Sequence, residues 1–517
     1  MYGQNGDFLS VLFEITQILF VLIDKHAFLY KFLHKNICPK KICVKILLEI
    51  DMFVGRKEEI RKLKELMAGD AYKAMMIFGR RRVGKTEIIK QALEGEEGII
   101  LHCECKKVLP SINLSLLEKE AKRVLGLPAY TTFSSYDDLF DAIFLAAKDQ
   151  KIIFVIDEFS YLPLGGDDGV DASLARLIDL RKGDDLHLKL ILSGSYCDLM
   201  QNIVDRSSPL HGHFDLIQEI HEFDYYDAAK FFSHYSPEEK FKAYAVFGGL
   251  PYALSLVNPS KSVEENIKDC FGVDTSTMTL LCQEMIESEG TKVASLNSVL
   301  NLVAVGKHKF SDLVAALGKD SRPEYALSKG VGLHFLTKVS PINDSQNKKL
   351  TYYDFDDNLL RFYFRYIFSN GSSISFMGKD LFYQEMVEPD FEKCYLPKAF
   401  ERVSKDFLIR KNKAGEIKPP FFQIGTYSFN DAKNKKNLQF DVVTQDKNGF
   451  ASYECKYTKD PIGMDTIHEK EKQTLQSPLP FYRLGYISRN GFTPEAKKRA
   501  PITYSLDEFY EERLDLK

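Results

Sequence analysis

The feature that most constrains this chain is the stretch of residues 79–86, which has the pattern G-x-x-x-x-G-K-[ST]. An apolar run, residues 74–78, precedes it, and residues 85–93 have a helical pattern. A strand that turns through glycines into a helix points backbone N–H groups and the positive helix end at a phosphate. The sequence therefore predicts a phosphate-binding loop for ATP, formed by Gly79, Arg80, Arg81, Arg82, Val83, Gly84, Lys85 and Thr86.

Two residues of this loop have predicted chemical roles. Lys85 would neutralise the β- and γ-phosphate oxygens, and the hydroxyl of Thr86 would ligate Mg²⁺. A second apolar run, residues 152–156, ends in the acidic pair Asp157 and Glu158. We expect Asp157 to hold Mg²⁺ through water and Glu158 to act as general base toward the attacking water.

A further apolar run, residues 188–192, ends in the tripeptide Ser193-Gly194-Ser195. A small polar residue at this place could sense the γ-phosphate or position the water. We expect Ser193 to do this, and a plain strand-terminating turn is the alternative.

Apolar runs at residues 74–78, 98–102, 151–156 and 188–192 alternate with helical stretches. Continuous apolar strands separated by helices indicate an α/β fold with a parallel sheet covered on both faces. We therefore expect a P-loop ATPase core over residues 52–220 and a helical lid over 221–285. Three helical stretches and an alternating hairpin indicate a winged-helix-like unit at 286–370, followed by a linker at 371–394 and an α/β domain at 395–517.

The first 51 residues contain an apolar run, residues 8–23, interrupted by Glu14 and Gln17. It is shorter than the ~20 residues that a membrane span needs. We interpret residues 1–51 as an extension upstream of a start at Met52, with a packed amphipathic helix and a membrane anchor as alternatives. A formal net charge of −4 gives no global basic field for nucleic acid, and nine cysteines without metal-type spacing favour reduced thiols in a cytoplasmic protein.

Several short motifs follow one another in a recognisable order: Phe53-Val54-Gly55-Arg56, the phosphate loop, Asp157-Glu158, Ser193-Gly194-Ser195, Ser208-Pro209-Leu210-His211-Gly212 and Gly248-Gly249-Leu250-Pro251. This set resembles the archaeal-type AAA+ ATPase family, which is related to the signal-transduction NTPases called STAND, over about residues 52–370. The resemblance implies ATP binding and hydrolysis. It also implies that Val54, Gly55 and Arg56 lie against the adenine and that Pro251 closes over the base or sugar.

One position departs from the family pattern. Members of the family often carry arginine after the glycine of the Pro-Leu-x-Gly motif, and this chain has His213 there. Arg206 is a possible substitute for an arginine that stabilises transition-state charge, and a surface arginine is the alternative. Arg80, Arg81 and Arg82 could touch the nucleotide or a neighbouring domain, or form a solvated basic rim. The oligomeric state stays open.

A second set of charged residues lies near the C-terminus. Asp441 ends an apolar run, and Glu454 and Lys456 are two apart in a predicted strand, so they share a face. A hairpin around residues 445–449 would bring Asp441 close to Glu454, and Glu401 lies on a predicted helix, residues 398–410. Glu401, Asp441 and Glu454 could hold Mg²⁺ for phosphodiester hydrolysis while Lys456 orients or deprotonates a water.

This order of acids and lysine resembles the PD-(D/E)xK nuclease fold over about residues 395–490. The resemblance implies a restriction-endonuclease-like domain that acts on or holds DNA or RNA. The alternative is a catalytically inactive binding or protein-interaction module attached to a regulatory NTPase. The winged-helix-like unit could read DNA directly or pack on the ATPase as a lid.

Overall fold

The structure is a computed structural model that describes residues 53–165, 169–273, 275–287, 293–318, 322–431 and 436–516. The chain divides into two units, residues 1–54 and 55–517, and the elements below belong to the second. The predicted N-terminal extension, residues 1–51, lies outside the described residues. Within the described ranges no helix is both long and apolar enough to cross a membrane.

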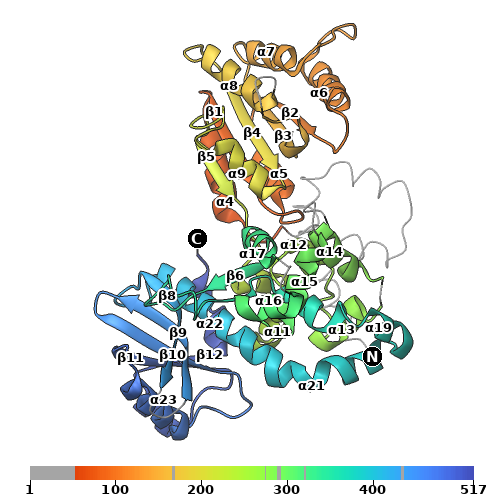
Figure 1. Ribbon diagram of the computed structural model, residues 1–517. Helices are drawn as coiled ribbons and strands as arrows, with labels where there is room; N and C mark the ends of the chain where they lie inside the picture. The colour runs from red at the N-terminus through yellow and green to blue at the C-terminus, as the bar shows by residue number, and fades with distance from the viewer. Residues whose placement is uncertain are drawn as a thin grey trace, which may run out of the picture. The chain divides into compact units, whose positions relative to one another are not determined.

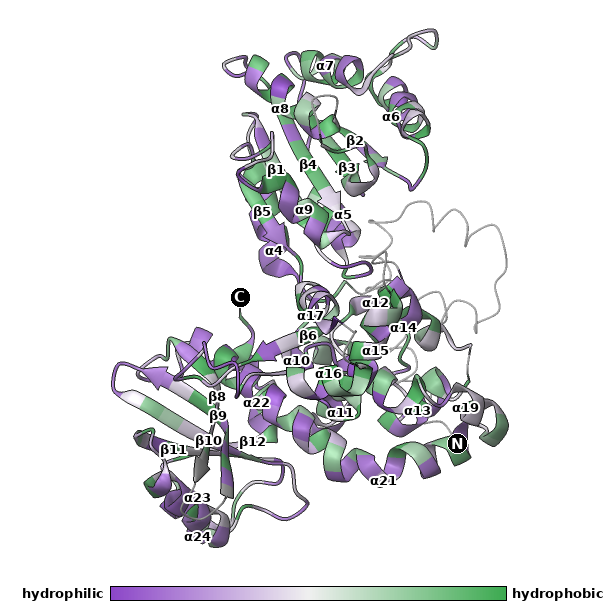
Figure 2. Ribbon diagram, in the orientation of Figure 1, coloured by the Kyte–Doolittle hydropathy of each residue, from purple (hydrophilic) through white to green (hydrophobic). Residues whose placement is uncertain are grey.

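The ATPase core is built on a parallel five-stranded sheet in the order β2-β3-β4-β1-β5 (Figure 1). Phe78 at the end of β1 pairs with Gly194 on one side and Glu219 on the other, so the carboxyl ends of three strands meet at one edge. Every residue of β3 and β4 is buried, and Figure 2 shows the hydrophobic colouring of these strands. The strands are β1 (Lys73–Phe78), β2 (Ile99–Glu104), β3 (Ile152–Asp157), β4 (Leu188–Gly194) and β5 (Leu216–Glu219).

Helices join these strands and bury one apolar core against the sheet. Phe140 and Phe144 pack in the same cluster as Phe154 of β3. The helices are α4 (Lys57–Met67), α5 (Lys85–Leu93), α6 (Pro110–Leu125), α7 (Tyr136–Ala146), α8 (Val170–Leu180) and α9 (Cys197–Val204). The predicted parallel α/β fold of the core is confirmed.

A group of helices follows the core, as predicted for the lid. Ser236 and Glu239 form a capping box at the start of α11, which fixes where that helix begins. Gly248 ends α11 with a φ of 69°, a left-handed conformation that favours glycine. The helices are α10 (Tyr225–Ala228), α11 (Pro237–Phe247), α12 (Pro251–Ser255), α13 (Val263–Phe271) and α14 (Thr277–Glu287).

Three helices and a hairpin come next, as the sequence predicts. The helices are α15 (Val293–Ala304), α16 (Phe310–Leu317) and α17 (Pro323–Gly332). Strand β6 (Leu336–Val339) pairs antiparallel with β7 (Tyr352–Phe355). We call residues 293–355 the helix–hairpin unit; its assignment as a winged helix stays a prediction.

Residues 358–413 are helical almost throughout, including the expected linker at 371–394. Phe382, Val387 and Phe391 are buried within this segment. Its elements are α18 (Asn358–Phe362), a π-helix (Tyr363–Ile367), α19 (Gly371–Met377), α20 (Lys379–Phe382), a π-helix (Tyr383–Val387), α21 (Glu388–Asp390), a π-helix (Phe391–Tyr395) and α22 (Leu396–Lys413). The last of these contains the helix predicted at residues 398–410.

The C-terminal region is a mixed five-stranded sheet in the order β12-β11-β10-β9-β8. Strands β8, β9 and β10 are antiparallel neighbours, and β11 and β12 run parallel to β10. The elements are β8 (Gln423–Asp431), β9 (Lys436–Asp446), β10 (Gly449–Lys456), α23 (Met464–Gln476), β11 (Phe481–Ser488), α24 (Pro494–Arg499) and β12 (Ile502–Ser505). A mixed α/β sheet is therefore present, and its likeness to nucleases stays a prediction.

Candidate functional site

The phosphate loop leaves the end of β1 and enters α5 through two glycines that the backbone requires. Gly84 caps α5 with a φ of 95°, in the region that glycine alone enters readily. A Cβ atom on Gly79 would lie 2.3 Å from the carbonyl oxygen of Ile220. The loop therefore packs directly on the segment that follows β5.

Lys85 is buried inside this loop. Its Nζ donates hydrogen bonds to the carbonyl oxygens of Gly79 (2.9 Å) and Arg80 (3.1 Å) and to Oγ of Ser195 (2.9 Å). Burial lowers the pKa of Lys85, against the opposing effect of Glu158 and Asp157. The ammonium group thus lies where a phosphate cradled by the loop would meet it.

The residues on the expected magnesium side are joined by hydrogen bonds. Thr86 Oγ1 donates to Asp157 Oδ2 (2.8 Å), and the Ser193 hydroxyl donates to the other carboxylate oxygen. Burial acts to raise the pKa of Asp157, but interactions with His102, Ser193 and Thr86 outweigh it and lower the pKa to about 2. An ionised carboxylate beside a threonine hydroxyl fits Mg²⁺, which prefers oxygen ligands.

Glu158 has a strained backbone and a partly unsatisfied side chain. Its φ is 53°, a left-handed conformation that is uncommon outside glycine and recurs at functional sites. One carboxylate oxygen accepts a hydrogen bond from the Ser195 hydroxyl, and the other, Oε2, is buried without a hydrogen-bond partner among the described residues. A free buried acceptor at this place fits an attacking water.

Sequence reasoning missed two residues of this site. Ser195 Oγ lies between Lys85 and Glu158, whereas the predicted sensor Ser193 bonds only Asp157 among the hydrogen bonds found for its side chain. His102, on β2, places its Nε2 3.8 Å from Asp157 Oδ2. Ser195 could have been found from its place just past the end of β4, but His102 carries no motif.

On the expected adenine side, Arg56 is held by backbone carbonyls. Its Nη2 donates to His221 O (2.6 Å) and Val83 O (3.3 Å), and its guanidinium lies 4.2 Å from the centre of the Phe223 ring. Pro251 Cγ lies 4.0 Å from the position of a Cβ built on Gly84. Pro251 therefore lies beside the phosphate loop, while base contact by Val54, Gly55, Arg56 and Pro251 stays a prediction.

The three loop arginines point to three different elements. Arg80 is buried and pairs with Glu222 (2.8 Å) and Asp357 (2.9 Å). The Arg81 side chain bonds the hydroxyl of Tyr161. Arg82 pairs with Glu284 of α14 at 2.7 Å. All three side chains thus contact neighbouring elements, and a role in touching the nucleotide stays a prediction.

His213 lies far from the phosphate loop along the strands. Asp215, two residues on, bonds the backbone of Ala74 near the start of β1, whereas the loop follows the end of that strand. His213 itself lies 3.3 Å from Asp179. An arginine at position 213 would therefore not reach the phosphate site of its own chain, and Arg206 is exposed.

In the C-terminal sheet, Asp441 and Glu454 come together across the β9–β10 hairpin, as predicted. Tyr453 pairs with Val442, and Asp441 Oδ2 accepts a hydrogen bond from the Cys455 amide (3.0 Å). Burial and the charges of Glu454 and Glu401 raise the pKa of Asp441 to about 7.

Two lysines hold the Glu454 carboxylate. Lys456 lies 2.7 Å from it, and Lys470 of α23, which the sequence did not suggest, lies 2.6 Å from its other oxygen. The Glu401 carboxylate pairs with Lys398 at 2.8 Å. Ligand atoms of Glu401, Asp441 and Glu454 do not gather within 4.8 Å of one another; among the described residues only Glu219, His221 and His334 form such a group of three.

The fold and the loop define a P-loop nucleotide-binding protein, and comparison with known families agrees. Residues 53–257 match the family described as an ATPase domain predominantly from Archaea, and residues 363–474 match one described as Archaea bacterial proteins of unknown function. The chain therefore carries an archaeal-type P-loop ATPase domain followed by a region of a type whose function is unknown.

Two relatives come from Methanocaldococcus jannaschii. The uncharacterized protein MJECL04 is 28% identical over 380 residues, which are 73% of this chain and 82% of the relative. The uncharacterized ATP-binding protein MJ0423 is 44% identical over 48 residues, which are 9% of this chain and 81% of the relative.

Among solved structures, the Walker-type ATPase Paby2304 of Pyrococcus abyssi aligns with a TM-score of 0.45 and 18% identity, over 61% of this chain and 97% of that one. The Aeropyrum pernix ORC2 protein, in its ADPNP–ADP complexes, aligns with a TM-score of 0.41 and 12% identity, over 63% of this chain and 96% of that one.

Proposed function

We propose that this protein is a Mg²⁺-dependent ATPase that works as a switch. The observation that carries the proposal is the continuous set of contacts from Lys85 through Ser195 to Glu158, beside the Thr86–Asp157 hydrogen bond. It combines a phosphate-binding cation, a metal-side carboxylate and a buried acceptor for water, which are the parts that phosphoryl transfer to water needs.

Each residue has one task in this proposal. Lys85 holds the β- and γ-phosphate oxygens, Thr86 and Asp157 hold Mg²⁺, and Glu158 takes the proton of the attacking water. Ser195 fixes the Glu158 carboxylate and places it next to Lys85. When bound, Mg²⁺ neutralises charge that develops on the phosphate oxygens.

The switch follows from the contacts of the loop arginines. Arg80 and Arg82 belong to the phosphate loop but pair with Asp357 and Glu284, which lie outside the core. A loop that tightens on phosphate moves these two arginines, so the nucleotide state is passed to the lid helices and to α18.

The test separates binding from turnover. Glu158→Gln should bind ATP like the parent protein but lose at least ~100-fold in kcat, because the amide cannot take the proton. Lys85→Ala should lose ATP binding, measured by calorimetry. Lys90→Ala, an exposed lysine on the same helix that pairs with Glu87 at 3.5 Å, is the matched control. Parent-like turnover in Glu158→Gln would contradict the assignment.

A second candidate function is metal-dependent cleavage of DNA or RNA by the C-terminal sheet. The closeness of Asp441, Glu454 and Lys456 supports it, because two carboxylates can hold a divalent ion while a lysine orients water. The pairing of Glu454 with both Lys456 and Lys470 equally suits a module that binds without cutting.

A cleavage assay decides between these two functions of the C-terminal sheet. DNA and RNA of several forms are incubated with the parent protein and Mg²⁺ or Mn²⁺, alongside Asp441→Asn and Glu454→Gln. Glu471→Gln, which removes an acid of α23 that pairs with Arg499 at 2.9 Å, is the control. Metal-dependent cutting that both site variants abolish supports a nuclease, and absence of cutting in the parent protein supports the binding module.

A further inference from the structure

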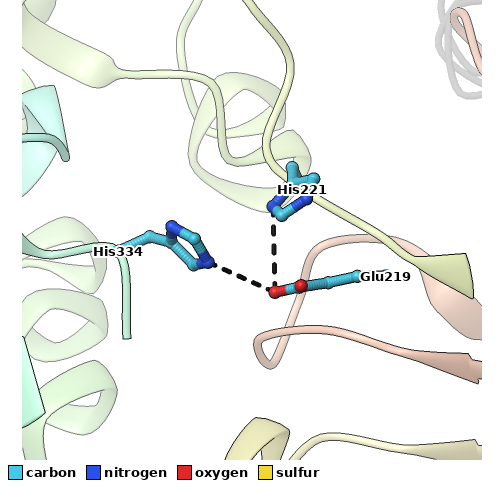
Figure 3. Close-up of side chains that lie close together, drawn as sticks. All are labelled: Glu219, His221 and His334. Carbon is cyan, nitrogen blue, oxygen red and sulfur yellow. Dashed lines mark hydrogen bonds and ion pairs between the residues drawn. The ribbon is translucent and has the colours of Figure 1, made fainter. Parts of the chain in front are cut away.

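Two histidines and a glutamate lie close together (Figure 3), and all three line a cavity beside the phosphate loop. Glu219 is the last residue of β5, His221 follows two residues later, and His334 lies in the turn between α17 and β6. Glu219 Oε1 lies 3.2 Å from His334 Nε2 and 3.9 Å from His221 Nδ1. We call these three residues the His–His–Glu cluster; their ligand atoms all lie within 4.8 Å of one another.

The spacing of these atoms fits a tetrahedral metal ion. Zinc lies about 2.0–2.2 Å from histidine nitrogen and carboxylate oxygen, so two ligands at a tetrahedral angle are about 3.3 Å apart. The Glu219–His334 separation of 3.2 Å has this value already. The Glu219–His221 separation of 3.9 Å needs only a small rotation of the exposed imidazole.

The backbone and the neighbours orient His334. Its φ is 56°, so a residue other than glycine occupies the left-handed region at this turn. Its Nδ1 lies 3.9 Å from Asp356 Oδ2, on the side away from Glu219. A carboxylate on this side of the ring commonly supports a metal-binding histidine; at 3.9 Å Asp356 acts here through its charge and does not accept a hydrogen bond.

The surroundings of the cluster are rich in carboxylates. The cavity has a volume of about 340 Å³, and Glu222, Asp356, Asp357 and Asp406 line it together with the cluster and with Arg80, which pairs with Glu222 and Asp357. The His221 and His334 rings meet edge to face, with centres 5.1 Å apart.

We propose that Glu219, His221 and His334 bind one divalent transition-metal ion, of the chemical class of Zn²⁺, and that this ion joins the end of β5 to the turn after α17. The site is separate from the Thr86–Asp157 pair, which has only oxygen ligands. Two nitrogen ligands select zinc, cobalt or nickel over magnesium.

The segment that carries two of the proposed ligands contacts the phosphate loop. Ile220, between two of the ligands, donates its amide to Phe78 O (2.7 Å) and packs its carbonyl against Gly79. The carbonyl of His221 accepts the hydrogen bond from Arg56. A bound metal ion therefore fixes the segment on which the phosphate loop packs. The metal site does not depend on the proposed ATPase function; only this effect on the loop rests on it.

The experiment measures metal binding without nucleotide. The full chain, treated with EDTA and carrying Asp441→Asn so that the C-terminal acids contribute less, is titrated with Zn²⁺ by calorimetry and with Co²⁺ by visible absorption. We expect one equivalent per chain, bound with micromolar affinity or tighter, and cobalt bands of a tetrahedral site with nitrogen ligands.

Variants assign the site. His334→Gly removes a ligand while suiting the left-handed backbone, so it should fold normally and bind at least ~10-fold more weakly. His221→Ala should weaken binding similarly, and His213→Ala, which removes a histidine paired with an acid outside the cluster (Asp179, 3.3 Å), should not. Unchanged affinity in His334→Gly, or no binding by the parent, overturns the proposal. Lys85→Ala should still bind zinc, which separates this outcome from failure of the ATPase assignment.

Discussion

Arg80 of the phosphate loop forms an ion pair with Asp357, 277 residues further along the chain, at 2.9 Å. The Asp357 side chain is fully buried, and that of Arg80 is 10% exposed. Asp357 also caps α18 by accepting a hydrogen bond from the Leu360 amide (2.9 Å). One carboxylate thus fixes the start of a helix and holds the loop that faces the nucleotide.

Breaking this pair should destabilise the protein. Arg80→Ala leaves Asp357 buried without its cation, which typically costs on the order of 3 kcal/mol in the free energy of unfolding. Arg82→Ala is the matched control, because its pair with Glu284 is partly exposed to solvent and contributes about 0–1 kcal/mol. Thermal unfolding checks this, and equal losses in the two variants would show that the Arg80 pair is not the stronger one.

Ser195→Ala and Ser193→Ala should have different effects on ATP turnover. Ser195 bonds Lys85 and Glu158, so its loss should lower kcat by roughly 10- to 100-fold with little change in KM. Ser193 bonds Asp157, so its loss should raise the Mg²⁺ concentration needed for half-maximal activity. Steady-state rates at several Mg²⁺ concentrations distinguish the two, and interchanged effects would reverse the roles of the two serines.

Asp406, which lines the cavity beside the loop, should make stability depend on pH. Burial raises its pKa to about 7, with Asp224 and Asp356 adding to the shift and Lys405 and Arg402 opposing it. Between about pH 4 and 7 the folded protein therefore holds a proton that the unfolded chain has lost, so this group lowers stability as pH rises. Asp406→Asn should gain about 1–3 kcal/mol over the parent protein at pH 8 and nothing at pH 4.

Urea unfolding of both proteins across this pH range measures the difference. A constant difference between parent and variant at all pH values would mean that Asp406 titrates alike in the folded and unfolded chain.

Gly249→Ala should be poorly tolerated. A Cβ at this position would lie 1.9 Å from the carbonyl oxygen of Phe223, whose amide bonds Gly249 O (2.9 Å). The backbone must move, so we expect a loss of about 1–3 kcal/mol and weaker ATP binding. Gly463→Ala, where a Cβ meets nothing within 4 Å, should be nearly neutral in both measurements. A stable Gly249→Ala protein with parent-like affinity would contradict this.

The sequence predicted those parts of the fold in which a run of neighbouring residues has one clear pattern, such as continuous apolar character. Strands β3 and β4 are buried along their whole length and are mostly apolar, so their sequences predict buried strands. Strand β5 has the sequence Leu-Ile-Gln-Glu and is only partly buried, which gives no such signal. Residues 371–394, which were expected to be a linker, are helical, and burial of Phe382, Tyr383 and Phe391 stabilises these helices.

The residues of the candidate sites also divide into those that a local sequence signal predicted and those that it did not. Lys85, Thr86, Asp157 and Glu158 follow from one motif and one strand end, and the structure brings them together. Lys470 reaches Glu454 from a separate helix. His334 reaches Glu219 from 115 residues away. One sequence carries no signal for contacts between residues so far apart, because only the tertiary fold brings them together.

The helical stretch that ends in α22 can also transmit motion from α11 to the C-terminal region. The hydroxyl of Tyr395 donates to Ala245 O of α11 at 2.7 Å, and Glu401 of the C-terminal carboxylate group lies on the helix that continues directly from Tyr395. The helix is continuous between Tyr395 and Glu401, so a rotation of α11 is transmitted along α22 to Glu401. Inserting one residue between Tyr395 and Glu401 would rotate Glu401 by about 100° about the helix axis while leaving both ends of the helix folded.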